Sequence, residues 1–392
     1  MKTTKKKNIE LSLLLLSLLI TSCNKSHRLE NGIISIDLRE VPSAIEIVLQ
    51  DIAEVEYVVI SNDSDFIPCT RMANTTDKYM LFKGGEDMDE LMLFDRKGNP
   101  ISKFNHNGQG PHEYLSILCQ TLDEKEKEIF VYDYWNDKMM VYDFEGNFIR
   151  SFKCTDVGEM HTYDDTTFIC HHYAVKKVKP DYMPYFTLVS KKDGNILRRI
   201  DLPYSINTQQ KLSVITEDSA GEELILSTIH WSLVSMLDGG FAFNELSSDT
   251  IYRFSPDEEM TPIMVREPSI TDDNTLFLEY GVNTKDYTFL TKTKADKNNP
   301  KNMFSSEEWI YSKQEDKVYK VKVINEDYPD YPIELNQHIL YEDLPQGYAM
   351  IRYRTHHLCE AYQNDKLHGE LKEIASKLNE EDNDVYMMIK FK

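Results

Sequence analysis

Short apolar runs alternate with polar positions along most of the chain, and three of them follow one pattern. The three segments are FDRKGNPISKF from Phe94, YDFEGNFIRSF from Tyr142 and SKKDGNILRRI from Ser190. Their Gly-Asn pairs start at positions 98, 146 and 194, so consecutive copies are 48 residues apart. A Gly-Asn pair between two stretches that alternate with period two predicts a β-hairpin in each copy.

Each predicted hairpin follows another apolar run that contains β-branched or aromatic residues. These runs are Tyr79–Phe82, Ile129–Tyr132 and Thr167–Cys170. With one further strand before each run, the repeating unit has four antiparallel strands. A four-stranded unit that recurs about every 40 to 50 residues predicts a β-propeller.

The later copies are longer and less regular. A fourth blade is predicted from Gly240–Phe243, Thr250–Phe254 and Pro262–Val265, a fifth from Trp309–Tyr311 and Val318–Val321, and a last one from Gly347–Arg354 and Val385–Phe391. Val55–Ile60 can join the last blade from the N-terminal side, which removes an exposed sheet edge. We therefore predict an all-β fold, a six-bladed β-propeller of four-stranded antiparallel blades, with five or seven blades as alternatives.

One segment near the end has helical periodicity. In Cys359–Asn379 the apolar residues recur at helical spacing, at Leu367, Leu371, Ile374 and Leu378. This predicts an amphipathic helix, inserted at about 359–380 before the closing strand. A shorter helical segment is predicted at Thr271–Tyr280.

The first residues have the pattern of an export signal. Lys5–Lys7 is positively charged and Leu11–Ile20 is apolar, but this apolar run is shorter than the about 20 residues that a membrane-spanning helix needs. Ile20–Cys23 resembles the lipobox of bacterial lipoproteins, in which the cysteine is acylated and becomes the first mature residue. We predict a signal peptide at 1–22, an acyl lipid on Cys23, a tether at 23–32 and one propeller domain at 33–392. The alternative is an ordinary cleaved signal followed by a chance cysteine.

The charge of the chain restricts its partners. The net charge is −22 over 392 residues, and nucleic acid or anionic lipid headgroups require a basic surface. We therefore expect no nucleic-acid partner and contact with the membrane through the lipid anchor.

The cysteines show no disulfide or metal pattern. Five remain besides Cys23, at wide spacing and without a CxxC pair: Cys69, Cys119, Cys154, Cys170 and Cys359. We interpret most of them as small buried apolar residues on strands, with one or two disulfides at most.

Histidines and one tryptophan are the candidate ligand-binding residues. His171-His172 and His356-His357 are adjacent pairs, and on a strand each pair directs one imidazole to each face, so each pair can offer one ligand to a central channel. From other blades, His106, His112 and His230 can add to them. Trp135 falls at a predicted turn, where an exposed ring suits a sugar or a protein partner. The candidates are Trp135, His112, His171 and His356.

No motif assigns catalysis or a cofactor. The chain lacks a GxSxG motif, a P-loop and zinc-ligand spacing. The acidic stretches Asn62–Asp65 and Thr271–Asn274 do not fit an EF-hand and are interpreted as turns. We assign no catalytic residue, no metal and no cofactor other than the acyl lipid.

The stretch GQGPHEY, from Gly108 to Tyr114, combines residues that occur in catalytic loops and in tight corners. It follows the first hairpin and precedes the next predicted strand, Ser116–Leu122. We interpret Gly108, Gly110, Pro111, Glu113 and Tyr114 as a structural corner between blades. Both glycines can adopt positive φ there, and Glu113 can accept backbone N–H groups.

These features resemble the six-bladed β-propeller lipoproteins of gut Bacteroidetes, which are distantly similar to NHL-repeat propellers. The resemblance rests on the lipobox at Cys23, the Phe94–Gly98 hairpin, the Gly108–Tyr114 loop and the closing segment Glu380–Lys392. This family usually has Gly-Pro-Gly-Glu where this chain has His112 between Pro111 and Glu113. The resemblance implies a propeller on a lipid anchor and supplies no catalytic residues.

Two functions follow as hypotheses. The first is an outer-membrane lipoprotein whose propeller is a non-catalytic binding or scaffolding module for a glycan, peptide or protein. The alternative is a propeller lyase or hydrolase with a metal-assisted site at the channel mouth. Asn24–Arg28 contains no acidic run of the kind that surface-exported lipoproteins often carry, which favours the periplasmic face.

Overall fold

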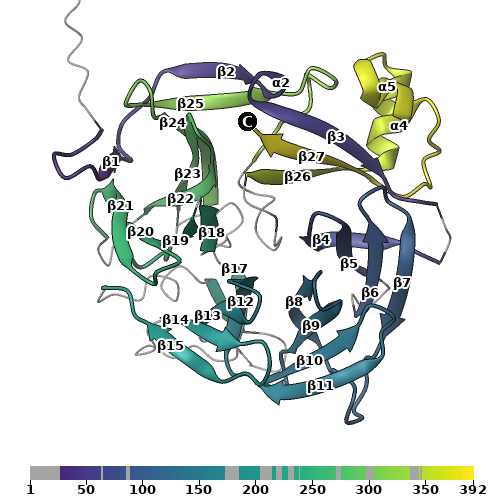
Figure 1. Ribbon diagram of the computed structural model, residues 1–392. Coiled ribbons are helices and arrows are strands. Elements are labelled where there is room, and N and C mark those ends of the chain that lie inside the picture. Colours follow the sequence, from purple (N-terminus) through teal and green to yellow (C-terminus); the bar gives the residue numbers. More distant parts are fainter. Residues whose placement is uncertain are drawn as a thin grey trace, which may run out of the picture.

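The chain folds as a six-bladed β-propeller, as predicted (Figure 1). The computed structural model describes residues 27–62, 65–84, 89–172, 185–203, 214–217, 223–227, 234–237, 239–270, 275–296, 304–335, 344 and 347–392, and at 69–73, 214–217 and 223–227 it describes the backbone alone. The predicted lipidation site Cys23 lies outside these residues, as do His230, Asp63, Ser64 and Thr271–Asn274.

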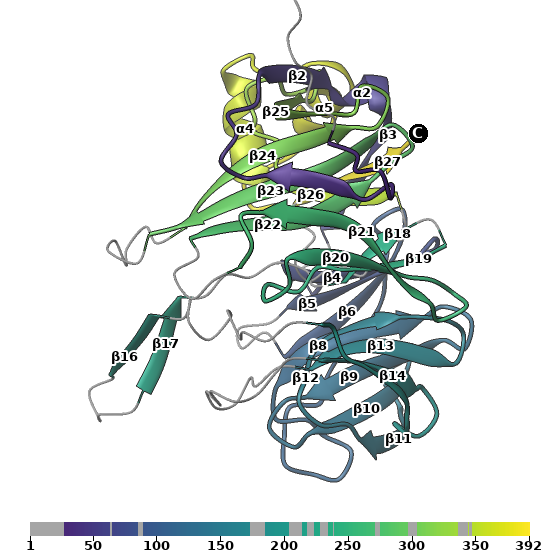
Figure 2. The same cartoon turned by 90° about the vertical axis from the view of Figure 1, so that its left-hand side faces the viewer.

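The first three blades are regular, four-stranded and antiparallel. Blade 1 contains β4 (Pro68–Thr75), β5 (Tyr79–Gly84), β6 (Glu90–Asp95) and β7 (Pro100–Asn105). Blade 2 contains β8 (Ile117–Asp123), β9 (Glu128–Asp133), β10 (Lys138–Asp143) and β11 (Phe148–Lys153). Blade 3 contains β12 (Val157–Thr162), β13 (Thr167–His172), β14 (Tyr185–Ser190) and β15 (Ile196–Ile200). A separate hairpin of β16 (Val214–Glu217) and β17 (Glu223–Ser227) projects from the body (Figure 2).

The last three blades each take a strand from the N-terminal segment. Blade 4 contains β18 (Val234–Leu237), β19 (Gly240–Phe243), β20 (Thr250–Phe254) and β21 (Met260–Glu267), and β1 (Ile34–Asp37) adds to β21 in parallel. Blade 5 contains β22 (Leu276–Asn283), β23 (Tyr287–Ala295), β24 (Phe304–Ser312) and β25 (Lys317–Ile324), with β2 (Ala44–Val48) parallel to β25. In blade 6, the described strands are β26 (Tyr348–Tyr353), β27 (Val385–Phe391) and β3 (Ala53–Val59), which follows the short helix α2 (Leu49–Ile52).

The N-terminal segment is thus a strap along the outer edges of three consecutive blades. Its last strand, β3, pairs with β27 and brings Val59 opposite Val385. The prediction that Val55–Ile60 completes the last blade is confirmed. The two parallel additions, β1 and β2, were not predicted.

The strand order defines two faces. In the first five blades the first strand lies nearest the axis and the last strand lies outside (Figure 1). The inner strands β4, β8, β12, β18 and β22 all end at the same face of the propeller. We call this the cavity face, and the other the opposite face. Because successive strands are antiparallel, the turn after β8 lies on the cavity face and the turn after β9 on the opposite face.

The Gly-Asn repeat forms the predicted turn between the third and fourth strands of blades 1 to 3. Gly98, Gly146 and Gly194 all have positive φ, at 83°, 86° and 73°. Each glycine also packs against the outer strand of the preceding blade. A Cβ on Gly98 would lie 2.2 Å from the Val59 carbonyl oxygen, and one on Gly146 would lie 2.7 Å from the Phe104 ring. The repeat therefore encodes both a turn and a close contact between blades.

The energetic cost of the turn and the cost of the blade contact can be separated by comparing two glycines with the same φ. Gly98 and Gly32 both have φ of 83°, but no atom lies within 4 Å of a Cβ built on Gly32. We expect Gly32→Ala to cost about 1 kcal/mol of unfolding free energy, from backbone strain alone. Gly98→Ala should cost about 3 kcal/mol, because the backbone of β3 must also move. Equal costs in urea unfolding would contradict the proposed contact.

Two expectations about helices are corrected. The insertion before the closing strand is helical, but it consists of two helices, α4 (Thr355–Gln363) and α5 (Gly369–Ala375), separated by a turn in which Asp365 has positive φ. The segment from position 276 to 280 belongs to strand β22 and is not helical. Within the described ranges no helix is long and apolar enough to cross a bilayer.

Apolar side chains fill the spaces between adjacent blades. Between blades 2 and 3 the core includes Phe130, Phe168 and the thiols of Cys154 and Cys170. Cys119, Cys154, Cys170 and Cys359 are unpaired. Burial raises the pKa of the Cys154 thiol to about 12, so this cysteine is a weakly reactive part of the core.

Asn325 connects the end of blade 5 to the closing blade and is fully buried. Its Nδ2 donates to the hydroxyls of Tyr57 (2.9 Å) and Tyr353 (3.1 Å), and its Oδ1 accepts from Gln50 Nε2 at 2.6 Å. These partners lie on β3, on β26 and in α2. One amide therefore joins the N-terminal strap to the C-terminal blade.

Candidate ligand-binding site

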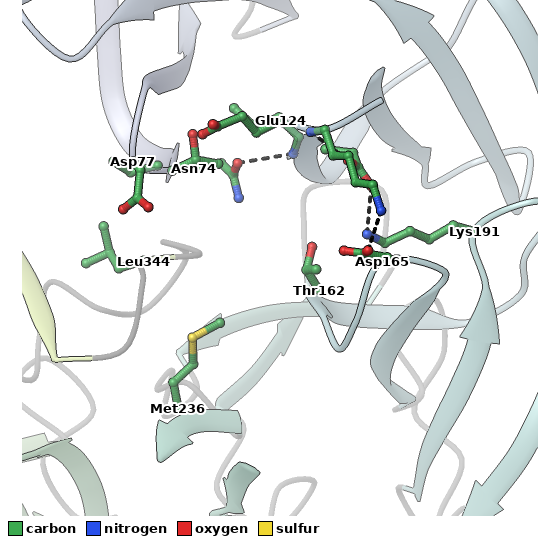
Figure 3. Close-up of a pocket in the computed structure, with 13 residues that line it drawn as sticks. Asn74, Asp77, Glu124, Thr162, Asp165, Lys191, Met236 and Leu344 are labelled. Atoms are coloured by element: carbon green, nitrogen blue, oxygen red, sulfur yellow. Dashed lines mark hydrogen bonds and ion pairs between the residues drawn. The ribbon is translucent and has the colours of Figure 1, made fainter. Parts of the chain in front are cut away.

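A cavity of about 370 Å³ lies on the cavity face, near the propeller axis (Figure 3). It is surrounded by the ends of the inner strands β4, β8, β12 and β18, and Leu344 borders it beside blade 6. The volume falls within the range of known small-molecule sites, roughly 300–1,000 Å³. Because its walls come from five blades, the closed ring is required to assemble it.

Asn74 at the end of β4 fixes the wall between blades 1 and 2. Its Nδ2 donates to Thr121 Oγ1 at 3.0 Å, and its Oδ1 accepts from the Leu122 N–H at 3.1 Å. Both hydrogen bonds are buried, so this wall is rigid.

An ion pair between blades 2 and 3 is buried beside the cavity. Lys191 Nζ lies 2.9 Å from Asp123 Oδ2, and both side chains are less than a tenth exposed. Burial opposes ionisation of Asp123, but the Glu126 N–H and the Lys191 ammonium outweigh it, so the pKa of this carboxyl lies below its usual value. The pair is therefore charged at neutral pH.

Two more ion pairs bridge neighbouring blades at the rim. Lys78 Nζ of blade 1 lies 2.5 Å from Glu124 Oε1 of blade 2, and Lys125 Nζ of blade 2 lies 2.5 Å from Asp165 Oδ2 of blade 3. Both lysines are exposed, so these pairs add little stability. Their effect is to neutralise two rim carboxylates.

In the described part of the chain, three polar groups of the cavity have no side-chain hydrogen bond or close ion pair of their own. Thr75 is 3% exposed and lines the cavity, and its hydroxyl has no hydrogen-bond partner in the described part of the chain. The Thr162 hydroxyl forms no hydrogen bond with a described side chain or backbone group, and Asp77 forms no ion pair with one. Figure 3 shows Asp77 and Thr162 on opposite sides of the cavity, with Leu344 beside Asp77 and Met236 at the lower edge.

A second cavity, also of about 370 Å³, adjoins the first and shares Thr162 and Met236 with it. Tyr163 and Phe241 line it, and their rings stack with centroids 5.6 Å apart. The Tyr163 hydroxyl donates to the Pro256 carbonyl at 3.3 Å, which fixes the ring. Most of the residues that line the first cavity are polar, and the second has an aromatic wall.

The structure does not bring the four predicted ligand-binding residues together. His171 is fully buried, and its Nε2 lies 2.8 Å from Glu245 Oε2, which is also fully buried. His356 is exposed in the first turn of α4 and is not on a strand, so the expectation of a channel-facing ligand there is wrong.

Trp135 and His112 lie on the opposite face, away from the two cavities. Trp135 is 60% exposed in the turn after β9, and its ring contacts Tyr134 edge to face. His112 is exposed and stacks on Phe148, with ring centroids 4.1 Å apart. This stacking gives His112 a packing role at the position where the resembling family usually has glycine.

The Gly108–Tyr114 loop connects β7 to β8 and is closed by its own hydrogen bonds. Gly110 N–H donates to Glu113 Oε2 at 2.7 Å, and the Tyr114 hydroxyl donates to the Asp89 carbonyl at 2.6 Å. Neither Gly108 nor Gly110 has positive φ, contrary to our expectation. The reason for glycine is space, because a Cβ on Gly108 would lie 2.0 Å from Glu113 Oε2. Pro111 lies between Gly110 and Glu113 in this loop.

A row of carboxylates crosses blade 5, outside the two cavities. Glu279 on β22 faces Thr291 on β23, which faces Glu308 on β24. Burial, with a contribution from the charge of Glu308, raises the pKa of Glu279 well above its usual value. Burial also raises the pKa of Glu308 to about 7, although its Oε1 accepts a hydrogen bond from Thr291 at 3.1 Å. Among the described residues no three histidine, cysteine or acidic side chains converge as a metal site.

Sequence reasoning missed the cavity residues because, apart from Ser116–Leu122, it did not place the inner strands. A signal was present: three of these strands end in mainly polar runs, at Thr75–Asp77, Asp123–Lys125 and Thr162–Asp165. Once the inner strands are aligned, these runs must meet at one end of the axis.

Fold and site together define a six-bladed propeller with a two-part cavity where its inner strands end. The chain belongs to the DUF4934 family, described as a domain of unknown function, whose profile matches residues 33–390.

Among solved structures, an exported protein of Bacteroides fragilis NCTC 9343 is similar over 92% of this chain and 99% of its own, with a TM-score of 0.60 and 15% identity. A DUF4221 family member of Bacteroides vulgatus ATCC 8482 aligns over 88% of this chain and 99% of its own, with a TM-score of 0.46 and 9% identity. At these identities the first similarity establishes the fold alone. No curated protein matches this chain.

Proposed function

We propose that this chain is a lipid-anchored, non-catalytic binding propeller that holds its ligand in the two joined cavities of the cavity face. The observation that carries the proposal is the cavity of about 370 Å³, whose wall includes Thr75, a buried residue whose hydroxyl has no hydrogen-bond partner in the described residues. A buried hydroxyl without a partner costs free energy, which a ligand hydrogen bond would recover. The rigid walls made by Asn74 and by the Asp123–Lys191 pair support the same proposal.

The experiment places a reporter at the rim. Asp77→Cys, carrying an environment-sensitive fluorophore, should respond to fractions of polysaccharide or protein digests that contain a ligand. A bulky second substitution, Met236→Trp, should block the shared wall and abolish the response. A control with the fluorophore at Trp135→Cys, on the opposite face, should stay silent. A response that survives Met236→Trp would refute the proposed site.

The proposal includes the anchor. The lipobox at Cys23 supports acylation, export and attachment to a membrane, and the lack of an acidic run in Asn24–Arg28 favours the periplasmic face of the outer membrane. The propeller fold is compatible with a distant relation to NHL-repeat propellers. His27 packs on the body, with its Nδ1 3.0 Å from the Ser35 carbonyl, so the predicted tether at 23–32 is shortened. Four residues span at most about 14 Å, so the body would stay close to the membrane.

Replacing Cys23 with alanine tests the anchor. In the native host the wild-type chain should incorporate labelled palmitate and sediment with membranes, because several acyl chains anchor a protein stably. Cys23→Ala should incorporate none and appear in the soluble fraction. Cys359→Ala, which leaves the lipobox intact, is the control. Membrane sedimentation of Cys23→Ala would contradict the acyl anchor.

No observation in the described residues favours the alternative, a metal-assisted lyase or hydrolase. The paired carboxylates of the cavity are held by lysines, and His171 is enclosed in the core.

A further inference from the structure

We propose that the ligand of the joined cavities is a neutral glycan of at least two sugar rings, one in each cavity. This inference rests on the proposed function and adds the chemical class of the ligand. It follows from the balance of charge, the kind of polar groups that are free and the nature of the two walls.

The charges of the first cavity are almost balanced. The described residues place four carboxylates there, and three are already paired with lysines at 2.5–2.9 Å: Asp123, Glu124 and Asp165. Within the described residues, Asp77 in the first cavity and Asp164 in the second lack an ion pair, and Asp164 accepts hydrogen bonds from the N–H and hydroxyl of Thr166. An anionic ligand would meet repulsion, and a cationic ligand would meet only these two exposed carboxylates, whose charges water and salt screen. A neutral ligand is therefore favoured, although the chain as a whole has a net charge of −22.

The free polar groups match sugar hydroxyls. Thr75 and Thr162 can each donate or accept a hydrogen bond, whereas the Asp77 carboxylate can only accept. A sugar hydroxyl does both at once, so neighbouring hydroxyls on one ring can satisfy all three groups. Met236 and Leu344 provide an apolar wall in the same cavity, which suits the C–H face of a pyranose ring (Figure 3).

The second cavity supplies the site for the next ring. Thr162 and Met236 border both cavities, so a ligand that fills the first and extends past these two side chains enters the second. There the fixed ring of Tyr163, partly exposed, offers an aromatic surface. Aromatic side chains give a rigid, amphipathic contact at low entropic cost. A linked pair of sugars therefore fits better than a single ring.

Titration calorimetry with defined sugars tests the inference. The probes are maltose, cellobiose, lactose, xylobiose, mannobiose and chitobiose, with their monosaccharides and pentalysine. At least one disaccharide should bind, about tenfold more tightly than its monosaccharide. Thr75→Val should weaken this binding about tenfold, which corresponds to one hydrogen bond. Tyr163→Leu should remove the advantage of the disaccharide and leave monosaccharide binding unchanged.

Matched controls separate the outcomes. Thr75→Val should fold at least as well as wild type, because the lost hydroxyl has no partner in the described residues. Thr261→Val and Tyr362→Leu, at exposed positions on β21 and α4, should leave binding unchanged. Pentalysine binding that Thr75→Val weakens would keep the site and overturn the glycan. Sugar binding that ignores both cavity variants would overturn the site, and failure of every sugar to bind would overturn the glycan.

Discussion

Replacing Asn325 with leucine is expected to lower the free energy of unfolding by about 4 kcal/mol, because it removes the buried amide that is hydrogen-bonded to Tyr57, Tyr353 and Gln50. Tyr57 and Tyr353 both accept from the Asn325 amide, and both are buried. Each unsatisfied buried group costs about 1–3 kcal/mol. The measurement is chemical unfolding of the purified soluble body.

Two variants make this prediction specific. Asn364→Ala removes an exposed amide whose side chain donates to the Glu360 carbonyl, and should cost less than about 1 kcal/mol. Adding Tyr57→Phe and Tyr353→Phe to Asn325→Leu removes the stranded hydroxyls and should recover part of the loss. A loss below about 1 kcal/mol for Asn325→Leu alone would show that water replaces the amide.

The second large effect is the pH dependence caused by the carboxylates of blade 5. Both Glu279 and Glu308 have pKa values above those of the unfolded chain, so the folded state binds more protons. The stability that these two carboxyl groups contribute in their protonated form is fully present below about pH 4.3. It is lost as the pH rises through the pKa of each folded-state group, which is about 7 for Glu308. Glu308→Gln should therefore raise the unfolding free energy by about 3 kcal/mol at pH 8 and leave it unchanged at pH 4.5.

The neighbouring Glu307 provides the control, because its pKa moves in the opposite direction. Burial is outweighed there by Lys320, whose Nζ lies 3.3 Å from the carboxylate. Glu307→Gln should therefore lower stability slightly at pH 8, by less than about 1 kcal/mol. The measurement is urea unfolding of the wild type, Glu308→Gln and Glu307→Gln between pH 4.5 and 8. Parallel curves for wild type and Glu308→Gln would show that Glu308 titrates normally.

The sequence predicted those parts of the fold that are encoded locally. The turns at Gly98, Gly146 and Gly194 need only a few adjacent residues, and their spacing revealed the blade. The parallel strands β1 and β2 escaped prediction because each is only four or five residues long and pairs with a strand more than 200 residues away.

The helical insertion was predicted as one helix because its apolar spacing continues through Leu367, which lies in the turn between α4 and α5. The residues of the candidate site are even harder to predict, because they are far apart in the sequence and meet only in the folded chain. Thr75 and Thr162 are ordinary strand-end residues in the sequence, and only the closed ring brings them to one cavity. The histidines were predicted as ligand-binding residues from their residue type alone, yet His171 is buried in the core.

The N-terminal strap also sets the order in which the molecule can be assembled. Blades 1 to 3 use contiguous stretches of chain, so each can form soon after its last strand has been synthesised. The strap comes first in the chain, but β1 requires β21 and β3 requires β27, which ends at Phe391. Strand β1 therefore stays unpaired until β21 has been made, and β3 until almost the whole chain is available. Ring closure becomes the last event of folding, and a chain truncated before β27 would keep an open ring with an unfinished cavity.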